Sequence, residues 1–397
     1  MRCLAISLFV TMIGCRGAAP QKPQDQDIAQ LVDSLRPAVE RTTGLAFRGP
    51  TKSAMRSREE LREFLLQKLQ QEFPPDRQEG VEAVYRMLGM VPDTLDLKAF
   101  LLELFSEQVA GFYDPETSTL YGMRGAEPAA LRFVLAHELV HALQHQYLPV
   151  DSIMRRQNDA DQQTAAHAVL EGHATLASLA AMLPNRSALR QPGFWELARE
   201  QVRAGTASMA VFSRAPLVFR EGMIFPYLSG AEFMRWWDSA RTDRPLPTVA
   251  ELPRSSEQIL HPDRYVRGDA PVSLRFAEDA EAPLFEDTLG ELEVQVLATE
   301  LRGGGEVLTG TAIGWGGDRF RAYRTPDGPA LVWYIAWDSE ADASRFMGGP
   351  GARLGARSRP GYRTSVTRVP ATTRPTIRVV IAPVAWGRWG RIPALQQ

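Results

Sequence analysis

The sequence predicts an α+β fold, in which a mainly helical body with one small β-hairpin is followed by a smaller α+β region. Apolar residues recur at helical spacing along most of the chain before residue 285. Two short strand-forming runs, 109–114 and 119–123, flank a turn-forming Pro-Glu-Thr-Ser. After about residue 285 the composition shifts towards Gly and strand formers. The length of 397 residues favours two domains, which we place at 28–284 and 285–397.

The first residues have the pattern of an export signal. Arg2 precedes an apolar run, Leu4–Ile13, which is too short to span a bilayer. The run ends in Met12-Ile13-Gly14-Cys15, which resembles a bacterial lipoprotein cleavage box with Met where Leu is usual. We expect residues 1–14 to be removed, Cys15 to carry lipid, and residues 15–27 to tether the protein to a membrane of the bacterial cell envelope. The alternative is a plain secretory signal in which Cys15 is incidental.

Charge and cysteine content exclude several classes of function. The net charge of −2 gives no indication of nucleic acid as a partner. The chain has 2 cysteines, Cys3 within the signal and Cys15 at its end. No thiol is left for a disulfide, a thiolate nucleophile or a cysteine-bound zinc. We therefore expect the fold to be stabilised by packing alone.

Sequence patterns typical of helices occur on both sides of the predicted hairpin. Asp27 is a candidate cap for a first helix, and Ser57-Arg-Glu-Glu60 has the form of a capping box. Other helices are predicted at 61–73, 81–88, 99–105, 128–147, 193–204, 225–240, 289–301 and 339–346, with a short one after the capping box Ser255–Gln258. A second long helix is predicted to start at Asp159 or Asp161 and to end before Pro184. The C-terminal region is predicted to contain a turn at 314–318, strands at 319–323, 330–337 and 376–383, and a loop at 348–361.

The predicted helix 128–147 contains the pattern His-Glu-x-x-His. His137 and His141 are four residues apart, so on a helix their imidazoles lie on one face and can bind one metal ion. Glu138 is rotated by roughly 100° from His137, which places it beside the metal. A carboxylate there can take a proton from a metal-bound water. The alternative is a pair of core histidines with Glu138 as a hydrogen-bond partner.

A catalytic zinc requires a third protein ligand and one open position. A histidine six residues after His141 is one option, but that position is Tyr147 and no Gly lies between. Glu171 is the better candidate, because it lies mid-helix among small and apolar residues, where an unpaired carboxylate is costly. Gly172 and Ala174 leave room for another helix to approach. The alternative is that Glu171 pairs with a buried His or Arg.

These motifs resemble those of the gluzincins, the zinc metallopeptidases of the thermolysin type. The resemblance rests on His137-Glu-Leu-Val-His-Ala-Leu-Gln and Leu170-Glu-Gly-x-Ala-Thr. A narrower likeness to a bacterial and archaeal envelope group adds Gly111-Phe-Tyr-Asp-Pro, Phe225-Pro-Tyr, the run from Glu257 to Tyr265 and Gly314-Trp-Gly-Gly-Asp-Arg. It implies a zincin-like fold, one catalytic Zn²⁺ on His137, His141 and Glu171, Glu138 as general base, and a peptide or protein substrate.

Two positions depart from that group, which usually carries Asp where this chain has His145 and His173. Those aspartates are expected to orient a ligand histidine. We expect His145, His167 and His173 to have orienting or structural roles, with metal binding as the alternative. The departures also leave open a scaffold that binds envelope partners with weak or no hydrolysis. An aminopeptidase is a third option, but the chain lacks the expected Gly-x-Met-x-Asn type motif.

Acyl transfer normally needs a second donor to the developing oxyanion. Tyr227 and His261 are the candidates downstream of the ligands. We predict Tyr227, in Phe225-Pro-Tyr, as this catalytic residue; the alternative is a core tyrosine. For His261 we favour a cap or loop role before Pro262. The predicted edge hairpin has two alternatives as well: it offers its backbone to an extended peptide, or it is an ordinary part of a small sheet.

Overall fold

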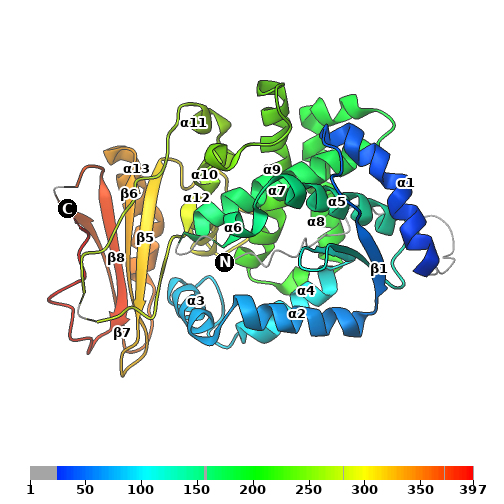
Figure 1. Ribbon diagram of the computed structural model, residues 1–397. Coiled ribbons are helices and arrows are strands. Elements are labelled where there is room, and N and C mark those ends of the chain that lie inside the picture. Colours follow the sequence, from blue (N-terminus) through cyan, green and yellow to red (C-terminus); the bar gives the residue numbers. More distant parts are fainter. Residues whose placement is uncertain (1–24, 156–158, 280, 371, 397) are drawn as a thin grey trace.

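The computed structural model describes residues 25–155, 159–279, 281–370 and 372–396. Residues 1–24, which include Cys15 and most of the predicted tether, lie outside the described residues. The described chain forms a helical body that carries a small sheet, followed by a second sheet in the C-terminal region (Figure 1). The α+β prediction is confirmed. The boundaries chosen for the two domains stay a prediction.

The first four helices are arranged in two places: the first lies at the upper right of the body in Figure 1, and the next three form its lower layer. They are α1 (Asp25–Thr43), α2 (Arg58–Glu72), α3 (Pro75–Leu88) and α4 (Leu97–Gln108). The predicted capping box is present at α2: the Glu60 N–H donates to Ser57 Oγ at 3.2 Å, and the Ser57 N–H donates to Glu60 Oε2 at 2.7 Å. Pro75 stands at the start of α3, where a missing N–H costs no helical bond.

The predicted hairpin is confirmed as part of a three-stranded sheet of order β1-β3-β2. Strands β2 (Gly111–Asp114) and β3 (Thr119–Met123) pair antiparallel, and β1 (Lys52–Arg56) adds to β3 in parallel. Strand β1 was not predicted, because its five residues carry charge at both ends and only Met55 is buried. Strand β2 is an edge strand and contacts α5.

Helices α5, α7 and α9 form the centre of the body, and α8 packs against α9 at its edge. Their bounds are α5 Pro128–Tyr147, α7 Ala160–Met182, α8 Pro192–Ala207 and α9 Leu217–Ala240, with the short α6 at Val150–Met154. The predicted α5 has the bounds found. Helix α9 begins eight residues earlier than predicted, because Pro226 lies inside the helix instead of starting it.

Helices α7 and α9 pack backbone to backbone. A Cβ added at Gly172 would lie 2.1 Å from the carbonyl carbon of Gly230, and a Cβ at Gly230 would lie 2.1 Å from Ala168 O. Neither position can therefore accept a side chain without moving a helix. The sequence predicted room for another helix at Gly172, and α9 occupies it.

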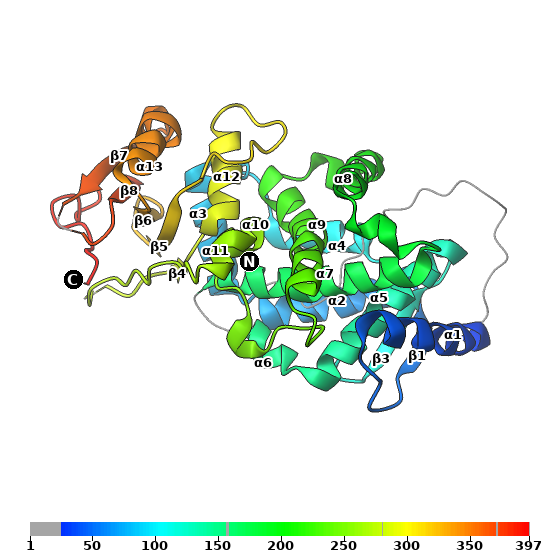
Figure 2. The ribbon, with the colours of Figure 1, turned by 90° about the horizontal axis from the view of Figure 1, so that it is seen from above.

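The second sheet has the strand order β4-β5-β6-β8-β7, and all neighbouring strands are antiparallel. Its strands are β4 Phe285–Asp287, β5 Trp315–Tyr323, β6 Ala330–Trp337, β7 Tyr362–Val369 and β8 Thr376–Pro383. The helices of this region are α10 Ser256–Leu260, α11 Pro262–Val266, α12 Gly290–Glu300, α13 Glu340–Phe346 and α14 Ala352–Ala356. Figure 2 shows α12 between the sheet and the helical body.

Both faces of this sheet are buried. Alternate residues of β6, among them Trp333 and Trp337, join the large core that includes Leu297 of α12 and Phe346 of α13. The other face is covered by Phe276 and by Trp386 near the end of the chain. The sheet is therefore packed against the helical body through α12 and covered behind by the C-terminal segment.

Two C-terminal predictions were wrong. The predicted turn at 314–318 belongs largely to β5, where a bulge at Trp315/Gly317 lets Gly317 take a φ of 139° against the backbone of Val272. The predicted loop at 348–361 contains a π-helical turn, Met347–Gly351, and α14. Gly and Pro favour turns, which is why a turn and a loop were predicted. Here the same residues permit a bulge and a π-helical turn, and packing against the core stabilises both.

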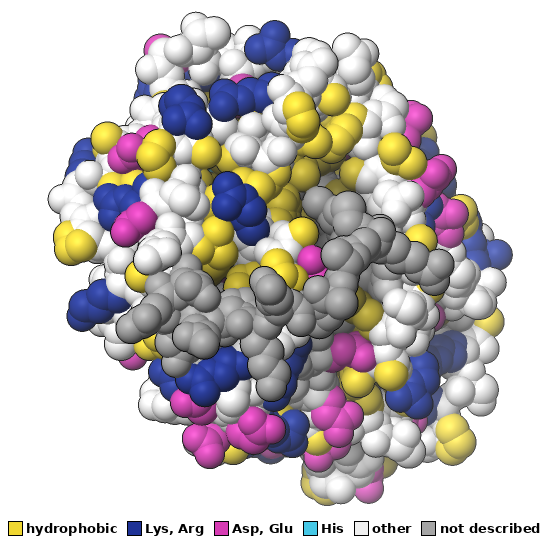
Figure 3. Space-filling view, turned by 90° about the vertical axis from the view of Figure 1, so that its right-hand side faces the viewer, with side chains coloured by type: hydrophobic (Ala, Val, Ile, Leu, Met, Phe, Trp, Pro, Cys, Tyr) yellow, Lys and Arg dark blue, Asp and Glu magenta, His cyan; other side chains and the backbone are white. Residues whose placement is uncertain are grey.

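On the face at the α1 end of the body, basic and acidic side chains are interspersed around hydrophobic ones (Figure 3). Within the part of the chain that the structure describes, no helix combines the length and hydropathy needed to cross a membrane.

We predict opposite effects for two Gly→Ala substitutions. Gly172→Ala should lower the free energy of unfolding by about 2 kcal/mol or more, because the new methyl group pushes α7 from α9. Gly222→Ala on α9 meets no atom within 4 Å and should raise it by about 0.5 kcal/mol. Urea unfolding of both variants measures this, and equal effects would contradict the close contact.

Candidate metal centre

Helix α5 presents two buried imidazoles at one point. The helix starts at Pro128, and the Glu127 carboxylate accepts the Ala130 N–H at 2.8 Å, which fixes its first turn. The Nε2 atoms of His137 and His141 lie 3.0 Å apart. His137 is fully buried and His141 is 8% exposed. The predicted placement on one helical face is found.

Helix α7 brings the Glu171 carboxylate to the same point. Its Oε2 lies 3.0 Å from His137 Nε2 and 3.3 Å from His141 Nε2. Ligand atoms about 2.0–2.1 Å from a tetrahedral zinc are separated from one another by about 3.3 Å. Two nitrogens and one carboxylate oxygen therefore form a triangle that fits such an ion in donor type and in spacing.

A second carboxylate competes for the third position. His137, Glu138 and His141 also present ligand atoms within 4.8 Å of one another. Glu138 Oε2, however, accepts the backbone N–H of Tyr113 on β2 at 2.8 Å. Glu171 has one oxygen within 3.3 Å of both imidazoles. The geometry thus favours Glu171 as the third ligand and places Glu138 beside the site.

The cluster is strongly coupled in its electrostatics. Burial lowers the pKa of His137 to about 4. Burial also acts to lower the pKa of His141, but the Glu171 carboxylate raises it to about 9. For Glu171 burial acts to raise the pKa, and the charge on His141 with hydrogen bonds from His137 and His141 holds it well below its usual range. A proton on His141 thus offsets the negative charge of the buried Glu171 carboxylate, which a bound cation would also do.

Gln144 orients His141, and sequence reasoning missed it. Gln144 Nε2 donates to Leu170 O at 2.8 Å, so its Oε1 is turned to His141 Nδ1, also at 2.8 Å. An amide oxygen only accepts, hence Nδ1 carries a hydrogen and Nε2 faces the cluster. The available signal was a glutamine in a buried stretch of α5, one turn after His141.

The three remaining histidines of this region have different surroundings. His167 Nε2 lies 3.1 Å from Glu171 Oε1, the oxygen that faces away from the imidazole pair. His173 Nδ1 accepts from Gln144 Nε2 at 3.1 Å, and burial lowers its pKa to about 3. His145 packs its ring 5.4 Å from that of Tyr113. Two of the three thus touch the candidate ligands or Gln144, and their orienting roles stay a prediction.

Of the two oxyanion candidates, the structure brings only Tyr227 to the cluster. Its ring centroid lies 5.9 Å from that of His137, and the residue is buried in an apolar cluster with Phe133 and Val134. Its catalytic role stays a prediction. His261 instead lies 3.1 Å from Glu291 Oε1 at the start of α11.

The cluster opens on the side of His141 and Glu171. A small cavity of about 30 Å³, the share of one water molecule, is lined by both, with Tyr113, His145 and His167. A neighbouring pocket of about 190 Å³ shares Tyr113, Pro115 and His145 with it. The site is therefore reached past the edge strand β2, whose Tyr113 amide is already engaged by Glu138.

Comparison with known proteins adds little to this geometry. A family described as a domain of unknown function (DUF8575) matches residues 278–383, which span most of the C-terminal sheet. The chain is similar to a solved protein of Chloroflexus aurantiacus described as "a putative hydrolase with a novel fold", with 18% identity, a TM-score of 0.34, and coverage of 62% of this chain and 90% of that one. No curated protein matches.

We predict that Gln144 tunes metal affinity. Gln144→Leu should weaken zinc binding by about 10–100-fold, because His141 loses the acceptor that orients it. Gln144→Glu keeps an acceptor for Nδ1 and should retain zinc binding within a few-fold. Equilibrium dialysis against zinc, with circular dichroism to verify folding, measures both. Equal affinity of the Leu variant and the unmodified chain would contradict the role.

Proposed function

We propose that this protein is a zinc-dependent hydrolase of peptide bonds. The observation that carries the proposal is the triangle of His137 Nε2, His141 Nε2 and Glu171 Oε2, with sides of 3.0, 3.0 and 3.3 Å, and with Glu138 beside it. Zinc bound by these atoms would supply a Lewis acid and lower the pKa of coordinated water to about 7. The remaining chemistry belongs to the protein.

Glu138 is proposed as the general base. Its Oε2 is held by the Tyr113 N–H, which fixes the plane of the carboxylate next to His137 and His141. In that position it takes a proton from the attacking water and passes it to the leaving amine. A carboxylate with this role contributes about 10²–10⁴-fold to the rate. Tyr227 is proposed as the donor to the developing oxyanion, from its place against His137.

The substrate is proposed to be an extended peptide or an unstructured protein segment. The reason is access: the cluster is reached past the edge strand β2, through a cavity and a neighbouring pocket that are both lined by Tyr113 of that strand and by Pro115 of the turn after it. The location is proposed to be the cell envelope, through lipid on Cys15. Fractionation of cells that express the unmodified chain or Cys15→Ser tests this, because only the lipidated form should sediment with membranes.

A second candidate function is a scaffold that binds envelope partners with weak or no hydrolysis. It is favoured by His145, which has taken the place of an expected acidic residue and contacts Tyr113. Peptide cleavage that 1,10-phenanthroline inhibits would eliminate it.

We predict that Glu138→Gln separates metal binding from cleavage. The variant should hold about one zinc per chain, since His137, His141 and Glu171 are untouched, and should cleave a peptide library about 10²–10⁴-fold more slowly. Metal analysis and mass spectrometry of the digest measure this. Glu103→Gln, an exposed carboxylate on α4, is the matched control and should cleave normally. Full activity of Glu138→Gln would sink the mechanism.

A further inference from the structure

A second cavity lies where the helical body meets the C-terminal sheet. Its volume is about 260 Å³, and its walls include Asp159 and Asp161 at the start of α7, Arg254 before α10, and Trp315 and Asp318 of β5. Asp161 stands ten residues before Glu171 on the same helix, a separation of roughly 15 Å along its axis. The cavity is therefore distinct from the candidate metal centre.

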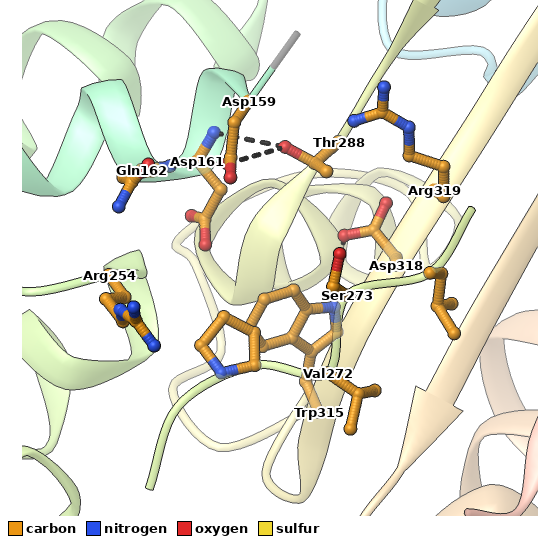
Figure 4. Close-up of a pocket in the computed structure, with 12 residues that line it drawn as sticks. Asp159, Asp161, Gln162, Arg254, Val272, Ser273, Thr288, Trp315, Asp318 and Arg319 are labelled. Atoms are coloured by element: carbon orange, nitrogen blue, oxygen red, sulfur yellow. Dashed lines mark hydrogen bonds between the residues drawn. The ribbon is translucent and has the colours of Figure 1, made fainter. Parts of the chain in front are cut away.

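Asp161 is a buried carboxyl group with an unused oxygen. The side chain is 3% exposed, and its Oδ1 accepts the Ser256 N–H at 3.0 Å. Among the described residues its Oδ2 has no hydrogen-bond partner. Figure 4 shows this carboxyl group directed into the cavity. Burial, with added effects of Asp159 and Asp318, raises its pKa well above the usual range. An oxygen in such a place is stabilised by any donor that reaches it.

The neighbouring Asp318 differs from Asp161, because both of its carboxylate oxygens accept hydrogen bonds. Its two oxygens accept the backbone N–H groups of Leu289 and Gly290, both at 2.9 Å, and the indole N–H groups of Trp315 and Trp333. Four donors leave it no capacity for a ligand, so its role is to hold the start of α12 on the sheet. Among the described residues Asp161 accepts from Ser256 alone, through the amide and the hydroxyl of that residue, and the contrast singles it out.

The positive charge available at the cavity comes from Arg254. Arg319 already pairs with Glu286, at 2.7 Å. Arg254 is exposed, and its guanidinium has no ion pair within the described part of the chain. Figure 4 shows Arg254 on the same side of the cavity as Asp161, with the Trp315 indole facing them. The cavity thus offers a deep acceptor and a cation at its rim.

We propose that this cavity binds a small zwitterion, a free amino acid or a dipeptide, whose ammonium group donates to Asp161 and whose carboxylate pairs with Arg254. An ammonium group has three donors and supplies the partner that Oδ2 lacks. A guanidinium binds a carboxylate through two parallel bonds. Pockets for drug-sized ligands have volumes of about 300–1,000 Å³, so the smaller volume found here suits a ligand of one or two residues.

The test is calorimetric titration of the full-length chain with the L-amino acids and with Ala-Ala, in the Glu138→Gln background so that no probe is hydrolysed. At least one free probe should bind, and its N-acetyl form at least tenfold more weakly. Asp161→Asn should weaken the free probe at least tenfold. No binding by any probe, or equal binding of the free and the acetylated form, would overturn the proposal.

A variant of Arg254 gives a second, independent test, which is needed if Asp161→Asn does not fold. Arg254→Gln should weaken the free acid severalfold and leave the C-terminal amide of the same probe unchanged. Arg267→Gln is the matched control, an exposed arginine that pairs with Asp263 outside the cavity. A probe that loses no affinity in Arg254→Gln, or that loses as much in Arg267→Gln, would show binding elsewhere, for example at the metal centre, and contradict the assignment.

Discussion

The candidate site depends on the contact between the backbones of α7 and α9 at Gly172 and Gly230. Glu171 immediately precedes Gly172, so the depth at which α7 sits sets the distance between its carboxylate and the imidazoles of α5. Side chains at these two positions would separate α7 from α9 and so change the distance between α7 and α5. Gly172 and Gly230 thus set the position of the candidate ligand Glu171, although neither glycine is itself a ligand.

The rest of the cluster is built to accept positive charge. One buried carboxylate meets three imidazoles, because Glu171 Oε2 faces His137 and His141 while Oε1 faces His167. Gln144 then ties α5 to α7 through Leu170 O and sets which nitrogen of His141 faces inward. The Glu171 carboxylate raises the pKa of His141 and so favours a proton there. A divalent ion would replace that proton and satisfy all three donor atoms at once.

Much of this was predictable from the sequence, for physical reasons. Helix α5 and strand β8 were predicted with their bounds because their apolar patterns end at clear signals. His137, His141 and Glu171 were singled out by helical spacing and by the cost of a buried carboxylate. Gln144 was not, since its role depends on a carbonyl of another helix. Strand β1 and the bulge in β5 were missed because both depend on tertiary partners, β3 and the backbone of Val272.

The most direct test of the central claim is crystallography of the full-length chain grown with zinc, with diffraction data collected on both sides of the zinc absorption edge. The account predicts one anomalous peak bound by His137 Nε2, His141 Nε2 and a Glu171 oxygen, at about 2.0–2.2 Å from each, with Glu138 outside the coordination sphere. A peak bound by Glu138 instead of Glu171, or no peak at these residues, would contradict it.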